Sequence, residues 1–489
     1  MGIKFRLYSA ARPISILWIA IALYIVVFSI FTGFRHYNFQ TQTWDMAIYE
    51  QVIWNTAHGR LMQSSIEEVP NHLGVHFGPL LFMLAPIYAV FPNTYTLLFL
   101  QTVALAFGAW PLFLLARRVL QHERLALAVS GAYLLSPSLH WVNTFDFHPV
   151  AFLVPFLIAA VYFALSARYG WSVLFFALAA SAKEDAILVV LFTALFLALL
   201  QRKIHPATPR LLSRRFALIV AASALAYFII TVTLLMPAFG GGLLRIDRYG
   251  QFGESAGEII KQIAANPTLV VQTIASVKKL LYAFWLFLPL AFFPFLSWRA
   301  LILLVPGLAE NLLTDFSSQF SSIYQYDAVL IGGLFIATVF GIRAALQRLP
   351  AYGRHLCYLL LAAAIFVFFL RSPISPFTFP AALFRANPHW EAFREIKAII
   401  PADVSVAAPT NLTPHLARRE HIYQIGYEPS MTDVLIADGA DYFGFSSPEA
   451  LNAHAERYMQ SGAYRAYGFR NRYLVLLRDG LAQDASGRK

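Results

Sequence analysis

The sequence predicts a mainly α-helical membrane protein that crosses the bilayer about eleven times and ends in a small α/β domain. Of the 489 residues, 58% are hydrophobic and only 13% are charged, whereas soluble domains average about 25% charged residues. Apolar runs suited to membrane-spanning helices recur from residue 14 to residue 370. After residue 388, short strand-like runs alternate with helical spacing. This composition excludes an ordinary soluble enzyme and a disordered chain.

The apolar runs give the order of the expected spans. A spanning helix needs about 20 apolar residues, with about 17 as the usual minimum. We interpret the first run as a retained helix rather than a signal peptide, because no small-residue cleavage site ends it. Segment 79–91 contains Pro86 and predicts a half-helix that does not cross. The predicted spans are 14–33, 95–116, 125–141, 150–167, 171–182, 186–201, 216–236, 280–297, 300–313, 327–342 and 356–370.

Basic residues set the orientation of these spans. With the N-terminus in the cytoplasm, Lys and Arg gather in cytoplasmic loops around 117–124, 202–215 and 343–354. The opposite face then receives two long loops, 34–94 and 237–279. We therefore predict a multi-pass protein of the plasma (inner) membrane with a cytoplasmic N-terminus. The net charge of +11 is explained by this topology and by anionic membrane lipid, so no nucleic-acid partner is expected.

Three regions follow along the chain: a membrane domain (1–370), a proline-rich linker (371–387) and an extracytoplasmic α/β domain (388–489). In the last region, HWEAFREIKAI and residues 447–460 have helical spacing, while VSVAA, HIYQI, DVLIA and YLVLL are typical of short strands. The single cysteine, Cys357, allows neither an internal disulfide nor a cysteine metal cluster.

Ionisable residues are costly in lipid, so polar segments in the outer loops are candidates for a site. Five such segments fall on the same face under this topology, which indicates a common location. The segments carry Asp45, then His76, then Asp146 with His148, then Lys183, Glu184 and Asp185, and finally Arg245 and Arg248.

Each of these residues also has a structural interpretation. Asp45 and Asp146 are placed where a carboxylate caps a helix, His76 and His148 suit hydrogen-bonded structural histidines, and Lys183 lies in a self-neutralising helix break. Spaced histidines and carboxylates also fit a metal, but no tight ligand motif such as H-E-x-x-H is present. We expect no tightly bound cofactor and at most a divalent cation.

Five segments resemble the prokaryotic membrane family called domain of unknown function 2079: TWDMAIYEQ, HFGPL, LLSPSLHWVNTFDFHP, AKED and NLTPHLARREHIY. The resemblance covers residues from about 30 to 480. The sequence departs from the family at Tyr324-Gln325-Tyr326, where histidines are expected. The family in turn is similar to the GT-C superfamily of membrane glycosyltransferases, which includes the protein O-mannosyltransferases.

This resemblance implies a sugar donor on a polyprenyl phosphate, and transfer to a glycan, lipid or protein acceptor on the outer face with inversion of the anomeric carbon. A carboxylate must then accept the acceptor's proton, and positive charge must stabilise the leaving phosphate. We expect the α/β domain to recognise the acceptor. Asp45 is the expected base and Asp146 the second carboxylate; Lys183, followed by Arg245 and Arg248, is expected to bind the donor phosphate, and His76, His148, Glu184 and Tyr49 the substrates.

Two other classes stay open. A transporter or lipid flippase also places polar groups near broken helices. However, the sequence shows no inverted repeat, and ionisable residues are sparse within the spans. A non-catalytic membrane scaffold that displays the outer domain would not need the outer group of acids and bases.

Overall fold

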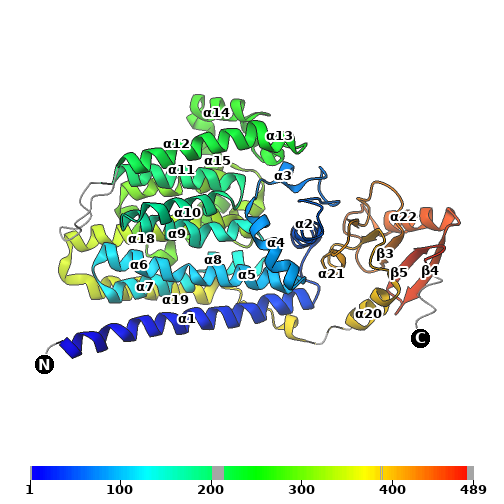
Figure 1. Ribbon diagram of the computed structural model, residues 1–489, viewed down its shortest axis with the longest axis horizontal. Coiled ribbons are helices and arrows are strands. Elements are labelled where there is room, and N and C mark those ends of the chain that lie inside the picture. The colour runs from blue at the N-terminus through cyan, green and yellow to red at the C-terminus, as the bar shows by residue number, and fades with distance from the viewer. Residues whose placement is uncertain (1–2, 201–213, 386, 388, 482–489) are drawn as a thin grey trace.

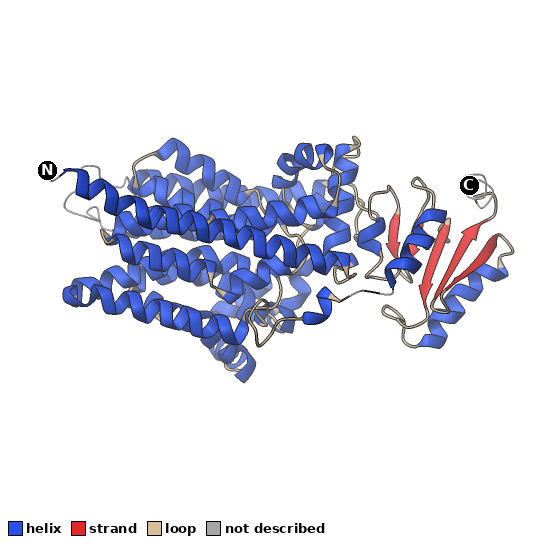
Figure 2. Ribbon diagram, turned by 90° about the horizontal axis from the view of Figure 1, so that it is seen from below, coloured by secondary structure: helices blue, strands red, loops and turns tan. Residues whose placement is uncertain are grey.

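The protein has a long helical body with a small α/β domain at one end (Figure 1). The computed structural model describes residues 3–200, 214–385, 387 and 389–481. The first helix begins at the end of the body opposite the domain and runs along the body towards it. Figure 2 shows the sheet confined to the domain. The predicted fold class, a helical membrane protein with a small C-terminal α/β domain, is confirmed.

Five helical stretches of the described residues are long and apolar enough to cross a membrane, and two strongly bent helix pairs raise this number to seven if each pair is one span. The predicted total of about eleven therefore stays a prediction. Helix α4 (Leu80–Val90) forms where the half-helix is predicted and contains Pro86, and its failure to cross the membrane stays a prediction. Residues 202–213 of the predicted basic loop lie outside the described residues. The five stretches are Ile14–Tyr37, Thr94–Leu120, Arg214–Ala238, Gln325–Arg348 and Pro350–Arg371.

The helices of the body pack both against their neighbours along the chain and against helices far apart in the sequence (Figures 1 and 2). Helix α18 (Ala328–Arg348) lies at the centre and is buried along most of its length. The remaining α-helices of the body are α1 (Ile3–Tyr37), α2 (Ile48–Ala57), α3 (His72–Val75), α5 (Thr94–Phe107), α6 (Ala109–Leu120), α7 (Glu123–Leu134), α8 (Pro137–Thr144), α9 (Leu153–Leu165), α10 (Tyr169–Ala180), α11 (Glu184–Leu199), α12 (Arg214–Ile230), α13 (Met236–Ala238), α14 (Ala256–Ala265), α15 (Pro267–Ile274), α16 (Val277–Phe287), α17 (Val305–Leu313) and α19 (Gly353–Arg371).

The apolar run 280–297 is not one helix, which corrects the predicted span. After α16, the chain makes one 3-10 turn, and Ala291 and Phe292 then adopt left-handed backbone with φ of 48° and 56°. Pro289 and Pro294 flank this break, and proline lacks the amide that helical hydrogen bonding requires. The next run is also divided, because a 3-10 segment, Trp298–Leu304, precedes the short helix α17.

The C-terminal domain contains a five-stranded sheet of order β2-β1-β3-β5-β4. The first three strands are mutually parallel, and β5 runs antiparallel to its neighbours β3 and β4. Strand β4 is not predicted from the sequence, because both of its faces are largely solvent-accessible and its residues do not alternate cleanly. The elements are β1 (Val406–Ala408), β2 (Ile422–Gln424), β3 (Val434–Asp438), β4 (Tyr464–Phe469), β5 (Tyr473–Arg478), α20 (His389–Ile399), α21 (Thr413–Leu416) and α22 (Pro448–Gln460).

Aromatic rings join the domain to the body. His415 of α21 stacks on His36 at the end of α1, with ring centroids 4.0 Å apart. Phe39 contacts His415 at 4.5 Å and Phe393 of α20 at 5.2 Å. All four side chains are largely buried, and aromatic pairs of this kind contribute about 0.5–1.5 kcal/mol beyond the burial of their area.

Polar contacts fix the orientation of the domain on the body. Thr43 and Thr410 exchange two hydrogen bonds, one from the amide and one from the hydroxyl of Thr43. Gln51 of α2 donates to the carbonyl oxygen of Glu420 over 2.8 Å. Arg418 lies 3.8 Å from the fully buried carboxylate of Glu50 on α2. The segment between β1 and β2 is therefore the docking segment of the domain.

Two outer segments of the body approach each other so closely that a glycine is required. The amide of Gly242 donates to the carbonyl oxygen of Gly74 in α3 over 2.9 Å. A Cβ atom on Gly241 would overlap the backbone of Gly74, whereas one on Gly242 would meet no atom within 4 Å. This contact anchors the segment that continues into the 3-10 helix η4 (Leu244–Phe252), which carries Arg245 and Arg248.

We expect Gly241→Ala to destabilise the protein by about 1–3 kcal/mol, because the added methyl group must push two backbones apart. Gly242→Ala is the matched control and should leave stability unchanged. The measurement is thermal unfolding of both variants in lipid nanodiscs, followed by tryptophan fluorescence. Equal melting temperatures for the two variants would show that the close approach does not constrain the fold.

Candidate functional site

A cavity of about 920 Å³ lies in the body, between the loop regions 34–94 and 237–279 and the central helix α18. Its wall combines segments that are far apart in the sequence, including the π-helical turn η1 (Thr43–Ala47), α2, the start of α11 and η4. Eight of the nine residues predicted for the site line this cavity. They are Asp45, Tyr49, His76, His148, Lys183, Glu184, Arg245 and Arg248.

Asp45 is held at the cavity wall by His148. Its Oδ1 lies 2.7 Å from Nε2 of His148, and the carboxylate is 23% exposed whereas the histidine is almost fully buried. Tyr49 packs edge-to-face against the same ring at 5.5 Å. Nδ1 of His148 has no hydrogen-bond partner among the described residues. The arrangement fixes one oxygen of Asp45 and leaves the carboxylate able to accept a proton from the cavity.

Asp146 does not line the cavity, which corrects its predicted placement as the second carboxylate of the site. Its side chain is buried, accepts a 3.0 Å hydrogen bond from the amide of Gln42 and lies 3.9 Å from Arg35. Burial raises the pKa of Asp146 to about 6, although Arg35 opposes this shift. Asp146 thus fixes the backbone immediately before η1, the turn that carries Asp45. It does so from outside the cavity.

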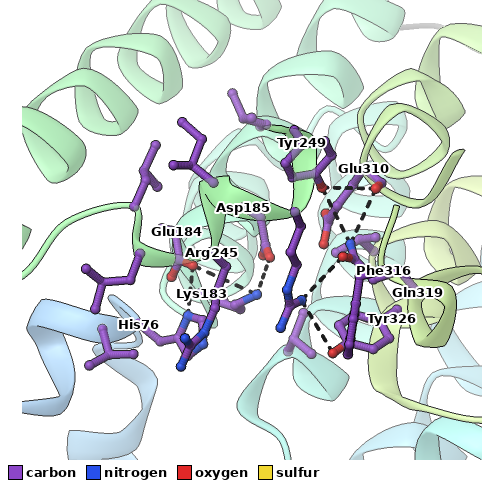
Figure 3. Close-up of a pocket in the computed structure, with 18 of the residues that line it drawn as sticks. His76, Lys183, Glu184, Asp185, Arg245, Tyr249, Glu310, Phe316, Gln319 and Tyr326 are labelled. Atoms are coloured by element: carbon purple, nitrogen blue, oxygen red, sulfur yellow. Dashed lines mark hydrogen bonds and ion pairs between the residues drawn. The ribbon is translucent and has the colours of Figure 1, made fainter. Parts of the chain in front are cut away.

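Lys183 is surrounded by acids. Its Nζ lies 2.5 Å from Asp185 and 3.8 Å from Glu184, as Figure 3 shows. Burial alone would lower the pKa of Lys183, but Asp185 and Glu184 raise it well above its usual value. The ammonium group therefore keeps its charge, and that charge is largely balanced by its neighbours.

Glu184 links two walls of the cavity. It receives a 3.0 Å hydrogen bond from the amide of Phe77 and lies 3.0 Å from Nδ1 of His76. Although burial raises it, the pKa of Glu184 is lowered to about 2 by His76 and Lys183. This carboxylate is ionised throughout the physiological range and serves as a bracket between α11 and the segment after α3.

The two arginines of η4 have different partners. Arg245 forms a 2.7 Å ion pair with Glu68. Arg248 instead donates to the side-chain oxygen of Gln319 at 3.3 Å and to the hydroxyl of Tyr326 at 3.4 Å. Its guanidinium also lies over the ring of Phe316, 4.3 Å from the centroid. No ion pair within 4.0 Å joins Arg248 to a described carboxylate, so its positive charge faces the cavity beside neutral groups.

Several lining residues are missing from the sequence predictions. Glu67 lies 2.9 Å from His72, and both line the cavity. Glu310 lines it from α17, and its presence as an acid inside an apolar run was a usable signal. Gln325 and Tyr326 also face the cavity. Among the described residues, no group of three His, Cys, Asp or Glu side chains is arranged to hold a metal ion.

The cavity has an apolar side as well as a charged one. The apolar side chains come from α11, α12, α14 and α17, and some of them also reach the outer surface: Ile260 is 69% exposed and Val305 is 45% exposed. The cavity can therefore accommodate a charged group and an apolar chain side by side. The main apolar contributors are Leu188, Phe192, Phe228, Val232, Ile259, Ile260, Ile263, Val305 and Ala309.

Comparison with known proteins agrees with this architecture. A family model described as a predicted membrane protein, DUF2079, matches residues 35–475. No curated protein matches the sequence significantly. Among solved structures, ArnT from Cupriavidus metallidurans bound to undecaprenyl phosphate is similar, with a TM-score of 0.52 and 11% identity over 96% of this chain and 99% of that chain. The fold of this chain is therefore similar to that of ArnT.

Weaker similarity extends to the oligosaccharyltransferase of Archaeoglobus fulgidus. Its apo form has a TM-score of 0.42 and 12% identity, over 92% of this chain and 74% of that chain. The form in complex with an inhibitory peptide and a dolichol-phosphate has a TM-score of 0.41, also with 12% identity and the same coverage of 92% and 74%.

The raised pKa of Asp146 predicts a specific dependence of stability on pH. The folded state favours the protonated carboxyl. The stability that protonated Asp146 adds to the folded state is therefore fully present below about pH 4 and is lost as the pH rises through about 6. A shift from 3.8 to about 6 corresponds to about 3 kcal/mol. Asp146→Asn, which mimics the protonated group, should remove this part of the pH dependence. Thermal unfolding of both proteins between pH 4 and 8 measures it, and parallel curves would contradict the assignment.

Proposed function

The chain belongs to the DUF2079 family of predicted membrane proteins, and we propose that it is a GT-C-like glycosyltransferase that moves a sugar from a polyprenyl phosphate to an acceptor hydroxyl. One observation carries the proposal: a single cavity holds the carboxylate of Asp45, an arginine with neutral partners and a partly surface-exposed apolar side. Such a transfer needs all three groups: a base for the acceptor, a cation for the donor phosphate and an apolar surface for the polyprenyl chain. We place the reaction on the outer face of the plasma membrane, with the N-terminus in the cytoplasm.

The donor lies with its polyprenyl chain along the apolar side and its phosphate near η4. The bilayer supplies this chain sideways, and the exposure of Ile260 and Val305 marks where it enters. The undecaprenyl phosphate bound to ArnT, a protein of the same fold, supports a donor of this class.

Arg248 is the first ligand of the donor phosphate. A guanidinium suits phosphate because its N–H groups match two oxygens at once. Arg245 is partly neutralised by Glu68, and Lys183 by Asp185 and Glu184, so each offers less free charge. Lys183 supports the site as a second cation, and His76 and Tyr49 contact the sugar.

Asp45 is the base. The acceptor O–H transfers its proton to Asp45 while its oxygen forms a bond to the anomeric carbon. The bond from that carbon to the phosphate oxygen breaks on the opposite side, and the electron pair leaves with the lipid phosphate, whose charge Arg248 stabilises. Direct displacement inverts the anomeric centre. The His148 contact keeps Asp45 oriented for the proton transfer.

Asp45→Asn should lower transfer by about 10²–10⁴-fold, because the amide cannot take the proton. The assay supplies purified protein in nanodiscs with radiolabelled polyprenyl-phosphate hexoses and pentoses and measures both release of polyprenyl phosphate and labelled product. Asp247→Asn is the matched control, since Asp247 lies outside the cavity on the same outer face. Full activity in Asp45→Asn with unchanged folding would remove Asp45 from the role of base. Repeating the wild-type assay with EDTA tests the expectation of no tightly bound metal.

Arg248→Gln should weaken binding of polyprenyl phosphate about 10–100-fold, because a hydrogen bond to a charged group contributes about 1.5–3 kcal/mol. Binding of polyprenyl phosphate alone, followed by tryptophan fluorescence, separates this effect from the sugar. Arg299→Gln is the control, since Arg299 does not line the cavity. Lys183→Gln should lower the melting temperature as well, because it removes the cation that pairs with Asp185. Unchanged affinity in Arg248→Gln would overturn the phosphate assignment.

A further inference from the structure

The edge of the C-terminal sheet nearest to Asp45 is where the ends of β1 and β2 meet the body. These parallel strands pair in register, with Ala408 beside Gln424 at their carboxyl ends. Immediately after β1, Thr410 exchanges hydrogen bonds with Thr43 of η1. The carboxyl edge of the sheet therefore abuts the turn that carries the proposed base.

The same edge is continuous with the cavity. Tyr427, three residues after β2, contacts the ring of Trp44 edge-to-face at a centroid distance of 5.2 Å. Trp44 lines the cavity next to Asp45. A molecule that lies on Tyr427 thus has a direct continuation to the site of proton transfer.

The strand order makes this edge the natural binding edge of the domain. β1 pairs in parallel with β2 on one side and with β3 on the other, so the chain connections diverge at the carboxyl end of β1. In open α/β sheets, ligands bind outside the carboxyl ends of the strands at such a point.

Two amide side chains at this edge have unsatisfied hydrogen-bonding groups. Gln424 is only 1% exposed, and neither its Nε2 nor its Oε1 has a partner among the described residues. Oδ1 of Asn411, just beyond β1, is also buried without a partner. Native proteins satisfy nearly all buried polar groups, so these amides indicate a ligand with both donors and acceptors.

Exposed aromatic rings lie beside these amides. Tyr427 and Phe443 are each 55% exposed. The Tyr427 ring lies close to Gln424, because a Cβ atom on Gly444 would lie 3.2 Å from that ring and 3.0 Å from Nε2 of Gln424. Phe443 directly precedes Gly444 in the chain. Asp438, at the end of β3, receives both hydrogen bonds of a bidentate pair with Arg472.

We propose that this edge binds the acceptor and that the acceptor is a glycan. The inference rests on the proposed function, which supplies the sugar, and deepens it by naming the acceptor class. Amides pair with the neighbouring hydroxyls of a sugar as donor and acceptor together, and aromatic faces pack on its C–H surface. A lipid acceptor needs a continuous apolar surface instead. A peptide acceptor bound by strand addition would need a free edge on β2, whereas Ser65 of the body already bonds to the amide and the carbonyl oxygen of Ile422.

The test measures direct binding to the full-length protein in nanodiscs, by titration calorimetry. The probes are the trisaccharides of glucose, N-acetylglucosamine and galacturonic acid, together with a serine- and threonine-containing peptide of similar mass. We expect at least one trisaccharide to bind, and Tyr427→Ala and Gln424→Leu each to weaken it at least 10-fold. Tyr467→Ala is the matched control, because Tyr467 lies on β4, the outermost strand on the side of the sheet away from β2.

Gln424→Leu separates a binding role from a structural one. Removal of two unsatisfied amide atoms should leave the melting temperature unchanged or raise it, while glycan binding falls. In a transfer assay, the KM for the glycan should rise far more than kcat falls. Binding of the peptide in place of every trisaccharide, or full affinity in both variants, would overturn the inference. Binding of polyprenyl phosphate to the wild-type protein, and its weakening in Arg248→Gln, test the donor site of the proposed function separately, since neither depends on this edge.

Discussion

The site depends on the hydrogen bonds that hold the backbone of one buried loop, which carries Asp146 and His148. The side-chain Nε2 of Gln101 on α5 donates to the backbone carbonyl oxygen of Asp146 over 2.8 Å, and its side-chain Oε1 accepts from the backbone amide of His148 over 2.7 Å. A buried loop without such partners would be costly, since no water can replace them. Asp146 in turn holds the amide of Gln42. Gln101 thereby fixes His148, and Asp146 fixes the turn η1 that carries Asp45.

Charge pairing decides which groups remain available in the cavity. In a space of low dielectric, most ionised side chains are stable only when paired. Lys183, Arg245 and His76 each have a carboxylate within 4.0 Å. Arg248 is stabilised instead by an aromatic ring and neutral oxygens, an arrangement that keeps its charge and leaves it available to an anion. The folded chain alone thus distinguishes the structural cations from the one suited to a ligand.

The sequence predicted the segments of the site better than their individual roles. Asp45 and Lys183 were found because ionisable residues are rare beside apolar runs, and a topology based on basic loops placed them on one face. Asp146 was predicted from the same signal, but its side chain turns into the protein, and spacing cannot reveal that direction. Gln101 lies within an apolar helix and carries no charge, so no pattern marked it. The break after α16 was missed for a related reason, because apolar composition conceals the left-handed residues that end the helix.

Helix α2 couples the domain to the cavity through adjacent residues. Tyr49 faces the cavity. Glu50 is fully buried between Tyr88 and Thr94 of the body and Arg418 of the docked domain. Successive residues of a helix point about 100° apart, so one helix serves both surfaces. The domain cannot shift on the body without moving α2 and the turn before it. Under the proposed function, the proton acceptor and the acceptor-binding edge are held by the same short segment and stay in fixed relation, which lowers the entropic part of the reaction barrier.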